Sequence, residues 1–161
     1  MKTVFFVRHG KSSWEYNVSD KDRPLKERGI RDASLVAESL ASTNQKLDFV
    51  FSSYANRALH TAVIVTRVLN HPFEKFQISK QLYDFSGDAV LDFLKTLDDE
   101  LQTVMVFGHN YAFTTLVNTL GDKYIDNVPT AGLTEIQFDV NQWSAIENGI
   151  TQRIIFPRDL K

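Results

Sequence analysis

TVFFVRHG, residues Thr3–Gly10, is the stretch from which the fold can be worked out. Four apolar residues in a row, Val4–Val7, stop abruptly at Arg8-His9-Gly10. An apolar run without polar alternation predicts a strand that is buried on both faces, as in parallel sheets. A guanidinium and an imidazole therefore follow the carboxyl end of a buried strand, which is where ligands bind in open α/β sheets. Gly10 allows a sharp turn and a close approach of a ligand to the backbone.

The composition is that of an ordinary globular protein. The 161 residues are 43% hydrophobic and 24% charged, so we expect a single domain over residues 1–161. A formal net charge of -2 gives no reason to expect nucleic acid or a membrane surface as a partner. The absence of cysteine excludes disulfides, thiol nucleophiles and thiolate metal sites. We see no apolar signal-peptide core or bilayer-spanning run, so a cytoplasmic location is expected.

Strands and helices are expected to alternate along most of the chain. The patterns predict strands at residues 3–8, 47–51, 76–78, 103–107, 133–138 and 153–156, and helices at residues 25–42, 55–69, 89–97 and 110–120. In the first helix, Ile30, Ala33, Val36, Ala37 and Leu40 should share the buried face. Ser52-Ser53 and Asn110 are candidate helix caps, and Trp143–Ile146 is a candidate extended segment. This order predicts βαβ units in a mostly parallel sheet with helices on both faces, mixed at its last strands.

Residues 11–24 form a polar, irregular segment that we expect to be a long loop. It contains Asp20, Asp22 and Arg23 close to Pro24. Long loops in compact domains often have a function. The alternative is a solvated loop with local ion pairs.

Four predicted strand ends place polar side chains at one edge of the sheet. They supply Arg8-His9, Ser52-Ser53 followed by Arg57, Asp84, and Gly108-His109. Arg57 would lie near the start of a helix, where the helix dipole disfavours a cation. Either it is an exposed arginine or it faces an anion.

Two arginines and two histidines at one edge favour a phosphate site. Guanidinium groups bind phosphate oxygens bidentately, and fixed cations stabilise a phosphoryl group in transfer. One histidine could attack phosphorus while the other stabilises the phosphoryl oxygens. Asp84 could protonate the leaving group if its pKa is raised. We expect no metal site, because the histidines lack metal-ligand spacing and the arginines would repel a cation.

The order of these motifs resembles that of a known family. The chain reads Arg8-His9-Gly10-Lys11-Ser12-Ser13-Trp14, then Asp20 to Leu25 (DKDRPL), Arg28-Gly29, Ser52-Ser53, Arg57-Ala58, Thr61-Ala62, Leu82-Tyr83-Asp84, Gly108-His109-Asn110 and Pro129-Thr130-Ala131-Gly132. It is similar to the histidine phosphatase, or phosphoglycerate-mutase-like, superfamily, and within it to the SixA-like phosphohistidine phosphatases. The resemblance implies a three-layer α/β/α sandwich with a mostly parallel, mixed sheet that contains one antiparallel strand, and it implies no cofactor.

The resemblance also implies roles for individual residues. His9 looks like the phosphorylated nucleophile, and Arg8, Arg57 and His109 look like the rest of the phosphate pocket. Asp84 stands about where the family has its proton donor. Lys11, Ser12 and Asn110 are candidates for contact with the substrate, whereas His60 either contacts it or is an ordinary solvated or packed histidine.

Two departures from the family pattern narrow the expected substrate. Mutases of this superfamily read RHGESxWN, whereas this chain has Lys11 and Glu15 at two of those positions, which argues against a mutase. The short chain also lacks the insertions that cover the site in larger relatives, so we expect an open pocket. We therefore expect a metal-independent phosphatase that acts on phosphohistidine in a phosphotransfer domain. A phosphatase for a small metabolite and a non-catalytic module that binds phosphoprotein are the alternatives.

Overall fold

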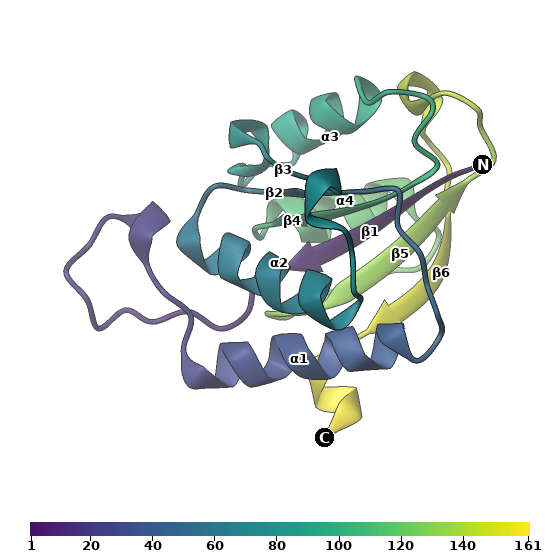
Figure 1. Cartoon of the computed structure of the whole chain (residues 1–161). Helices are drawn as coiled ribbons and strands as arrows, with labels where there is room; N and C mark the ends of the chain where they lie inside the picture. Colours follow the sequence, from purple (N-terminus) through teal and green to yellow (C-terminus); the bar gives the residue numbers. More distant parts are fainter.

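The computed structural model describes all 161 residues and contains one six-stranded sheet with helices on both faces (Figure 1). The strands are β1 (Lys2–Arg8), β2 (Phe49–Ser52), β3 (Phe76–Ile78), β4 (Thr103–Gly108), β5 (Leu133–Phe138) and β6 (Ile150–Ile155). The α-helices are α1 (Glu27–Ala41), α2 (Asn56–Val68), α3 (Asp88–Lys95) and α4 (Ala112–Leu120). The sheet order is β3-β2-β4-β1-β5-β6. None of the helices combines the length and the apolar content that crossing a bilayer requires.

The central strand β1 explains the three layers. Its side chains alternate between two apolar clusters, one on each face of the sheet. Val4 and Phe6 join the cluster that includes residues of α3 and α4, whereas Phe5 and Val7 join the cluster that includes residues of α1 and α2. The apolar run without polar alternation therefore did mark a strand buried on both faces, and the predicted α/β/α sandwich is confirmed.

The parallel part of the sheet brings three strand ends together. Strand β4 pairs in parallel with β1 and β2, with Gly108 opposite Arg8 and Phe107 opposite Ser52. Strand β5 runs antiparallel to β1, and β6 runs antiparallel to β5, so the sheet is mixed where we expected it to be. The residues that follow β1, β2 and β4 consequently lie at one edge of the sheet, where the site is found.

Some local expectations were wrong. Ile30 is 37% exposed because it lines an open pocket on the outer side of α1, together with Arg31 and Ser34. Trp143–Ala145 is a 3-10 turn, since the Trp143 backbone N–H and indole N–H bond to Asp99 and Leu101 and do not pair with a strand.

Most helix and strand limits also differ from the expectation by a few residues. Strand β6 begins at Ile150 because it pairs with β5 from there on. Ala55 stands at the N-cap of α2, and the hydroxyl group of Ser53 is used in the site described below.

Candidate active site

His9 follows β1 and presents an unprotonated ring nitrogen. Its Nδ1 lies 2.7 Å from the carbonyl oxygen of Gly10, which can only accept, so Nδ1 carries the proton. Nε2 therefore keeps its lone pair and accepts a hydrogen bond from Arg57 Nε at 3.3 Å. Burial, opposed by the Gly10 bond but reinforced by the neighbouring charges, holds the pKa of His9 well below its usual value. The imidazole is thus neutral around pH 7.

Backbone contacts fix the turn that holds His9. The N–H of Gly10 donates to Thr61 Oγ1 at 2.9 Å, and the same hydroxyl group donates to the Arg57 carbonyl oxygen at 2.7 Å. The carbonyl oxygen of His9 accepts from the Ala131 N–H at 2.9 Å. Thr61 thereby links the His9-Gly10 turn to the first turns of α2.

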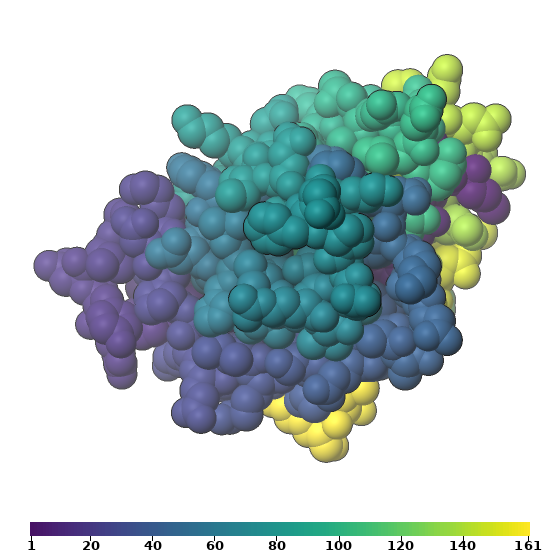
Figure 2. All heavy atoms as spheres, in the orientation of Figure 1, coloured from purple at the N-terminus to yellow at the C-terminus, as the bar shows by residue number.

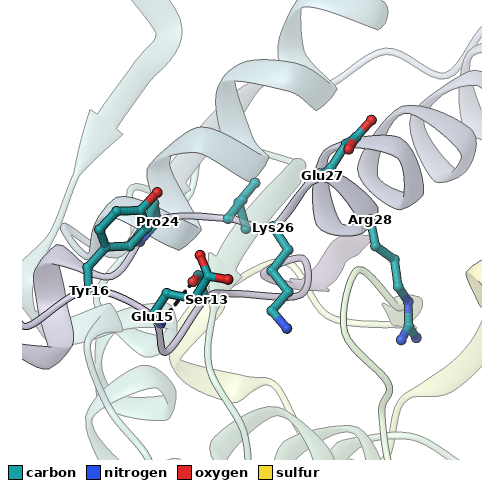
Figure 3. Close-up of a pocket in the computed structure, with 8 residues that line it drawn as sticks. Ser13, Glu15, Tyr16, Pro24, Lys26, Glu27 and Arg28 are labelled. Atoms are coloured by element: carbon teal, nitrogen blue, oxygen red, sulfur yellow. Dashed lines mark hydrogen bonds between the residues drawn. The ribbon is translucent and has the colours of Figure 1, made fainter.

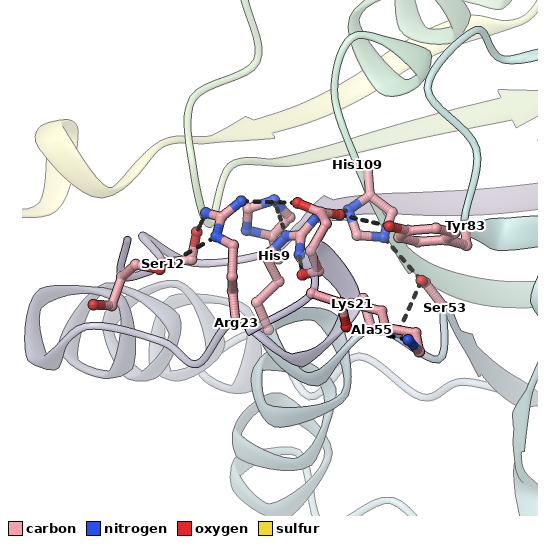
Figure 4. Close-up of polar contacts among 12 residues, drawn as sticks. His9, Ser12, Lys21, Arg23, Ser53, Ala55, Tyr83 and His109 are labelled. Atoms are coloured by element: carbon pink, nitrogen blue, oxygen red, sulfur yellow. Dashed lines mark hydrogen bonds and ion pairs between the residues drawn. The ribbon is translucent and has the colours of Figure 1, made fainter. Parts of the chain in front are cut away.

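Arg57 lies in the first turn of α2 with its side chain only 3% exposed, and its guanidinium presents two edges. Figure 4 shows His9 and His109 near each other, with Ser53 and Tyr83 beside His109. The edge formed by Nε and Nη2 faces His9 Nε2 and His109 Nδ1, at 3.3 and 3.4 Å. The edge formed by Nη1 and Nη2 faces Asp20, whose carbonyl oxygen and carboxylate lie at 2.6 and 2.9 Å. Arg57 is therefore not an exposed arginine: it faces an anion, the Asp20 carboxylate.

His109 follows β4 and is fully buried beside His9. The two ring centroids are 5.3 Å apart. His109 Nε2 lies 2.8 Å from Ser53 Oγ, at the end of β2, and an Nε2–H that donates to this hydroxyl leaves Nδ1 free to accept from Arg57. Burial, and then the charge of Arg57, lowers the pKa of His109 to about 3. Both histidines are thus neutral in the free site.

Arg8 completes the positive side of the site and keeps an unused donor. Its Nη1 donates to the Val128 carbonyl oxygen at 2.8 Å, whereas its Nε is buried without a hydrogen-bond partner. Its charge lowers the pKa of both His9 and His109. A buried guanidinium N–H without a partner is costly unless a ligand uses it.

Asp84 makes no hydrogen bond to the arginines and histidines of this cluster. Its carboxylate accepts hydrogen bonds from the backbone N–H groups of Ser86, Gly87 and Val90, at 3.0, 3.0 and 3.1 Å. Burial would raise the pKa of Asp84, but these hydrogen bonds outweigh it and lower the pKa. A proton donor needs the opposite shift, so the lowered pKa counts against Asp84 as the acid, and its carboxylate binds the backbone of the turn before α3.

The other candidate residues make no hydrogen bond to Arg8, His9, Arg57 or His109. Ser12 is buried and its hydroxyl group accepts from Arg23 Nη2. The Asn110 amide bonds to Asn127 and Thr114, and Lys11 is half-buried with its carbonyl oxygen bound to the Lys26 N–H. The side chain of His60 is exposed on α2.

Sequence reasoning missed two side chains that complete the polar network. The Asp20 carboxylate accepts from Arg57, from Arg23 Nη1 at 3.0 Å and from the Tyr83 hydroxyl group at 2.6 Å. Tyr83 also packs edge-to-face on His109, with the ring centroids 5.3 Å apart. The unfavourable position of Arg57 in its helix was the one signal for a facing anion, but it did not say which acid would supply it.

The cluster is nearly buried, with His9, Arg57 and His109 each no more than 7% exposed. No group of three or more His, Asp or Glu side chains is arranged to hold a metal ion. A separate pocket of about 470 Å³ lies between the loop and the start of α1, lined by Ser13, Glu15, Tyr16, Pro24, Leu25, Lys26, Glu27 and Arg28 (Figure 3). It includes none of the arginines and histidines of the site. The pocket is therefore distinct from the cluster of Arg8, His9, Arg57 and His109.

Comparisons with known proteins agree with this geometry. The sequence model of one protein family, the histidine phosphatase superfamily (branch 1), matches residues 4–90 of this chain. An uncharacterised protein of Mycobacterium tuberculosis is 26% identical over 160 residues, which cover 93% of this chain and 98% of that protein. A phosphoglycerate mutase of Schizosaccharomyces pombe is 38% identical over 89 residues, covering 53% of this chain and 42% of the mutase. The protein histidine phosphatase SixA complexed with tungstate superposes with a TM-score of 0.84 at 26% identity, covering 99% of both chains. This chain therefore belongs to the histidine phosphatase superfamily.

Proposed function

We propose that the chain hydrolyses phosphohistidine, or another phosphomonoester, through a covalent intermediate on His9. The observation that carries the proposal is the 2.7 Å hydrogen bond from His9 Nδ1 to the Gly10 carbonyl oxygen. This bond commits the ring proton to the backbone and leaves the Nε2 lone pair available. An attacking imidazole must be unprotonated at the attacking nitrogen, and the lowered pKa of His9 maintains that state.

The reaction has two displacements at phosphorus. In the first, His9 Nε2 forms a bond to phosphorus while the bond to the leaving group breaks, and the leaving group departs with the electron pair. In the second, water attacks the phosphorus of phospho-His9, the proton that water loses passes to a phosphate oxygen or to solvent, and the electron pair of the broken N–P bond returns to Nε2. Inorganic phosphate leaves, and the imidazole is restored.

The cations around His9 would stabilise the phosphoryl group in both displacements. The Nε/Nη2 edge of Arg57 faces His9, and the unpartnered Nε of Arg8 supplies a further donor. A phosphoryl group in transfer spreads negative charge over its equatorial oxygens, so fixed donors at these positions lower the barrier. His109 lies beside them, and a bound phosphate dianion would raise its low pKa towards protonation. With these groups the mechanism needs no metal ion and no organic cofactor.

The nature of the leaving group favours phosphohistidine as the substrate. The Asp84 carboxylate is occupied by backbone N–H groups and has a lowered pKa, so it is poorly suited to protonate an alkoxide. A phosphoimidazole with a protonated ring leaves as a neutral imidazole and needs no acid from the enzyme. The likeness to SixA, which is named a protein histidine phosphatase, supports a phosphorylated protein as the substrate. A phosphotransfer domain in the cytoplasm is the partner that we propose.

The test compares phosphate release from a histidine-phosphorylated phosphotransfer protein with release from a panel of small phosphomonoesters. The variants are His9→Ala and, as a matched control, His60→Ala, which removes an exposed histidine of α2. We expect preferential release from the phosphoprotein, lost in His9→Ala and kept in His60→Ala. Release from small esters alone would indicate a metabolite phosphatase. Saturable binding of the phosphoprotein by the wild type without any release would indicate a binding module.

A further inference from the structure

Part of the loop that precedes α1 contacts the site. Residues Asp20–Asp22 form a short 3-10 turn, η1, in a segment that projects from the body of the molecule (Figures 1 and 2). Asn56, at the start of α2, donates to the Asp22 carbonyl oxygen at 3.0 Å. The Asp20 side chain, 41% exposed, closes over the nearly buried Arg57 from the solvent side. The η1 turn thus packs on the start of α2, the helix that carries Arg57.

Asp20 holds the edge of Arg57 that the substrate does not need. The backbone carbonyl oxygen and the carboxylate of Asp20 bind Nη1 and Nη2, at 2.6 and 2.9 Å. The other edge, Nε and Nη2, stays directed at His9 and His109. A phosphoryl group on His9 Nε2 would meet this inner edge, so Asp20 and the phosphoryl group can use the guanidinium at the same time. Asp20 therefore does not occupy the place of the phosphate.

Asp20 is itself held from two further sides. Tyr83 donates its hydroxyl group to the carboxylate at 2.6 Å, and Arg23 donates to the other oxygen at 3.0 Å. Arg23 in turn stacks on the Trp14 ring, 3.4 Å from its centroid, and donates to Ser13 at 3.2 Å. A carboxylate that accepts from three fixed donors has little freedom to move. Because Asp20 is fixed, its hydrogen bonds also restrict the orientation of the Arg57 guanidinium.

On the basis of the proposed function, we propose that Asp20 is a positioning residue that aligns Arg57 with the phosphoryl group on His9. The guanidinium would otherwise rotate about its long side chain, because its inner edge faces only two imidazole acceptors at 3.3 and 3.4 Å. A catalytic group displaced by about 1 Å can cost about 100-fold in rate. The hydrogen bonds from Tyr83 and Arg57 outweigh burial and hold the pKa of Asp20 below its usual value, so the carboxylate stays ionised at neutral pH.

The test measures kcat, KM and the Kd of inorganic phosphate for Asp20→Ala and Asp20→Asn. Asp22→Ala is the matched control, because it removes the same charge from the same turn and its carboxylate contacts only Ser19. We expect kcat to fall about 10- to 100-fold in Asp20→Ala and less in Asp20→Asn, which keeps an acceptor. The Kd of phosphate should change less than about threefold, and Asp22→Ala should behave like the wild type. An unchanged or raised kcat in Asp20→Ala would overturn the proposal and indicate a loop that merely obstructs the site.

A double-mutant cycle shows whether Asp20 acts through Arg57. In an Arg57→Lys background the side chain has no second edge to align, so Asp20→Ala should change kcat less than about twofold. Equal losses in both backgrounds would contradict the proposal.

If the wild type releases no phosphate from any substrate, the proposed function fails. The order of Arg57 is then read from the NMR signal of its Nε–H, which should be slow to exchange in the wild type and in Asp22→Ala but not in Asp20→Ala. A slowly exchanging signal in all three proteins would overturn the positioning role by itself.

Discussion

Gly29→Ala is the substitution for which helix propensity and the structure predict opposite results. Gly29 lies in the first turn of α1, where alanine normally stabilises a helix by about 1 kcal/mol. Here, however, Gly29 packs directly on the backbone of Gly10 and Lys11. A Cβ atom at Gly29 would stand 2.7 Å from the Lys11 nitrogen and closer still to the Lys11 carbonyl oxygen. Backbone atoms cannot rotate away, so α1 and the Gly10-Lys11 turn would have to separate.

The size of the effect follows from these contacts. Overpacking costs about 1–3 kcal/mol in proteins, and we expect the upper part of that range because both partners are backbone. After subtraction of the propensity gain, Gly29→Ala should lower the free energy of unfolding by about 1–2 kcal/mol. The midpoint of thermal unfolding should fall by about 2–8 °C. Since the Gly10 carbonyl oxygen fixes the His9 tautomer, kcat should fall as well.

Urea unfolding followed by circular dichroism measures the first effect, and phosphate release measures the second. Ser39→Ala is the control within α1, because the Ser39 side chain makes no hydrogen bond and should be neutral to this change. A Gly29→Ala variant as stable as the wild type, or more stable, would refute the close-contact argument.

Other substitutions test the remaining parts of the site. Thr61→Val leaves the Gly10 N–H without its acceptor and should lower the free energy of unfolding, measured by urea titration, by about 1–3 kcal/mol. Thr66→Val removes only a donor, so it should lower the free energy of unfolding by less. The neutral state of His109 should make the wild type lose stability as the pH falls from about 6.5 towards 3, because the unfolded chain takes up the proton first. Between pH 7 and 5 this loss is about 2 kcal/mol, and equal pH dependence in His109→Asn would contradict it. Asp84→Ala should destabilise the protein by about 1 kcal/mol and slow good and poor leaving groups equally; selective slowing of poor leaving groups would restore its role as the acid.

The strand ends were predictable because they follow from local sequence. Apolar runs that stop at Arg8, Ser52 and Gly108 mark buried strands, and parallel pairing then places their ends at one edge. No knowledge of the loops is needed for that inference. The meeting of Arg57 with the two histidines follows from it.

The contacts made by the loops could not be predicted in the same way. Asp20 reaches Arg57 across 37 residues of chain, and nothing in the local pattern of residues 11–24 distinguishes it from Asp22. The role of Asp84 depends on the conformation of the turn before α3, which turns its carboxylate towards backbone N–H groups. Gly29 could be read only as a weak point of a helix until its contact with Lys11 was known.

The central claim is that the phosphoryl group passes through His9 Nε2. It is tested most directly by quenching the reaction with histidine-phosphorylated protein in alkali, which preserves phosphohistidine, and by locating the phosphate with mass spectrometry. The covalent mechanism predicts transient phosphorylation of His9 that decays as inorganic phosphate appears, and neither event in His9→Ala. Turnover that continues in His9→Ala, or phosphate found on another residue of the wild type, would contradict it.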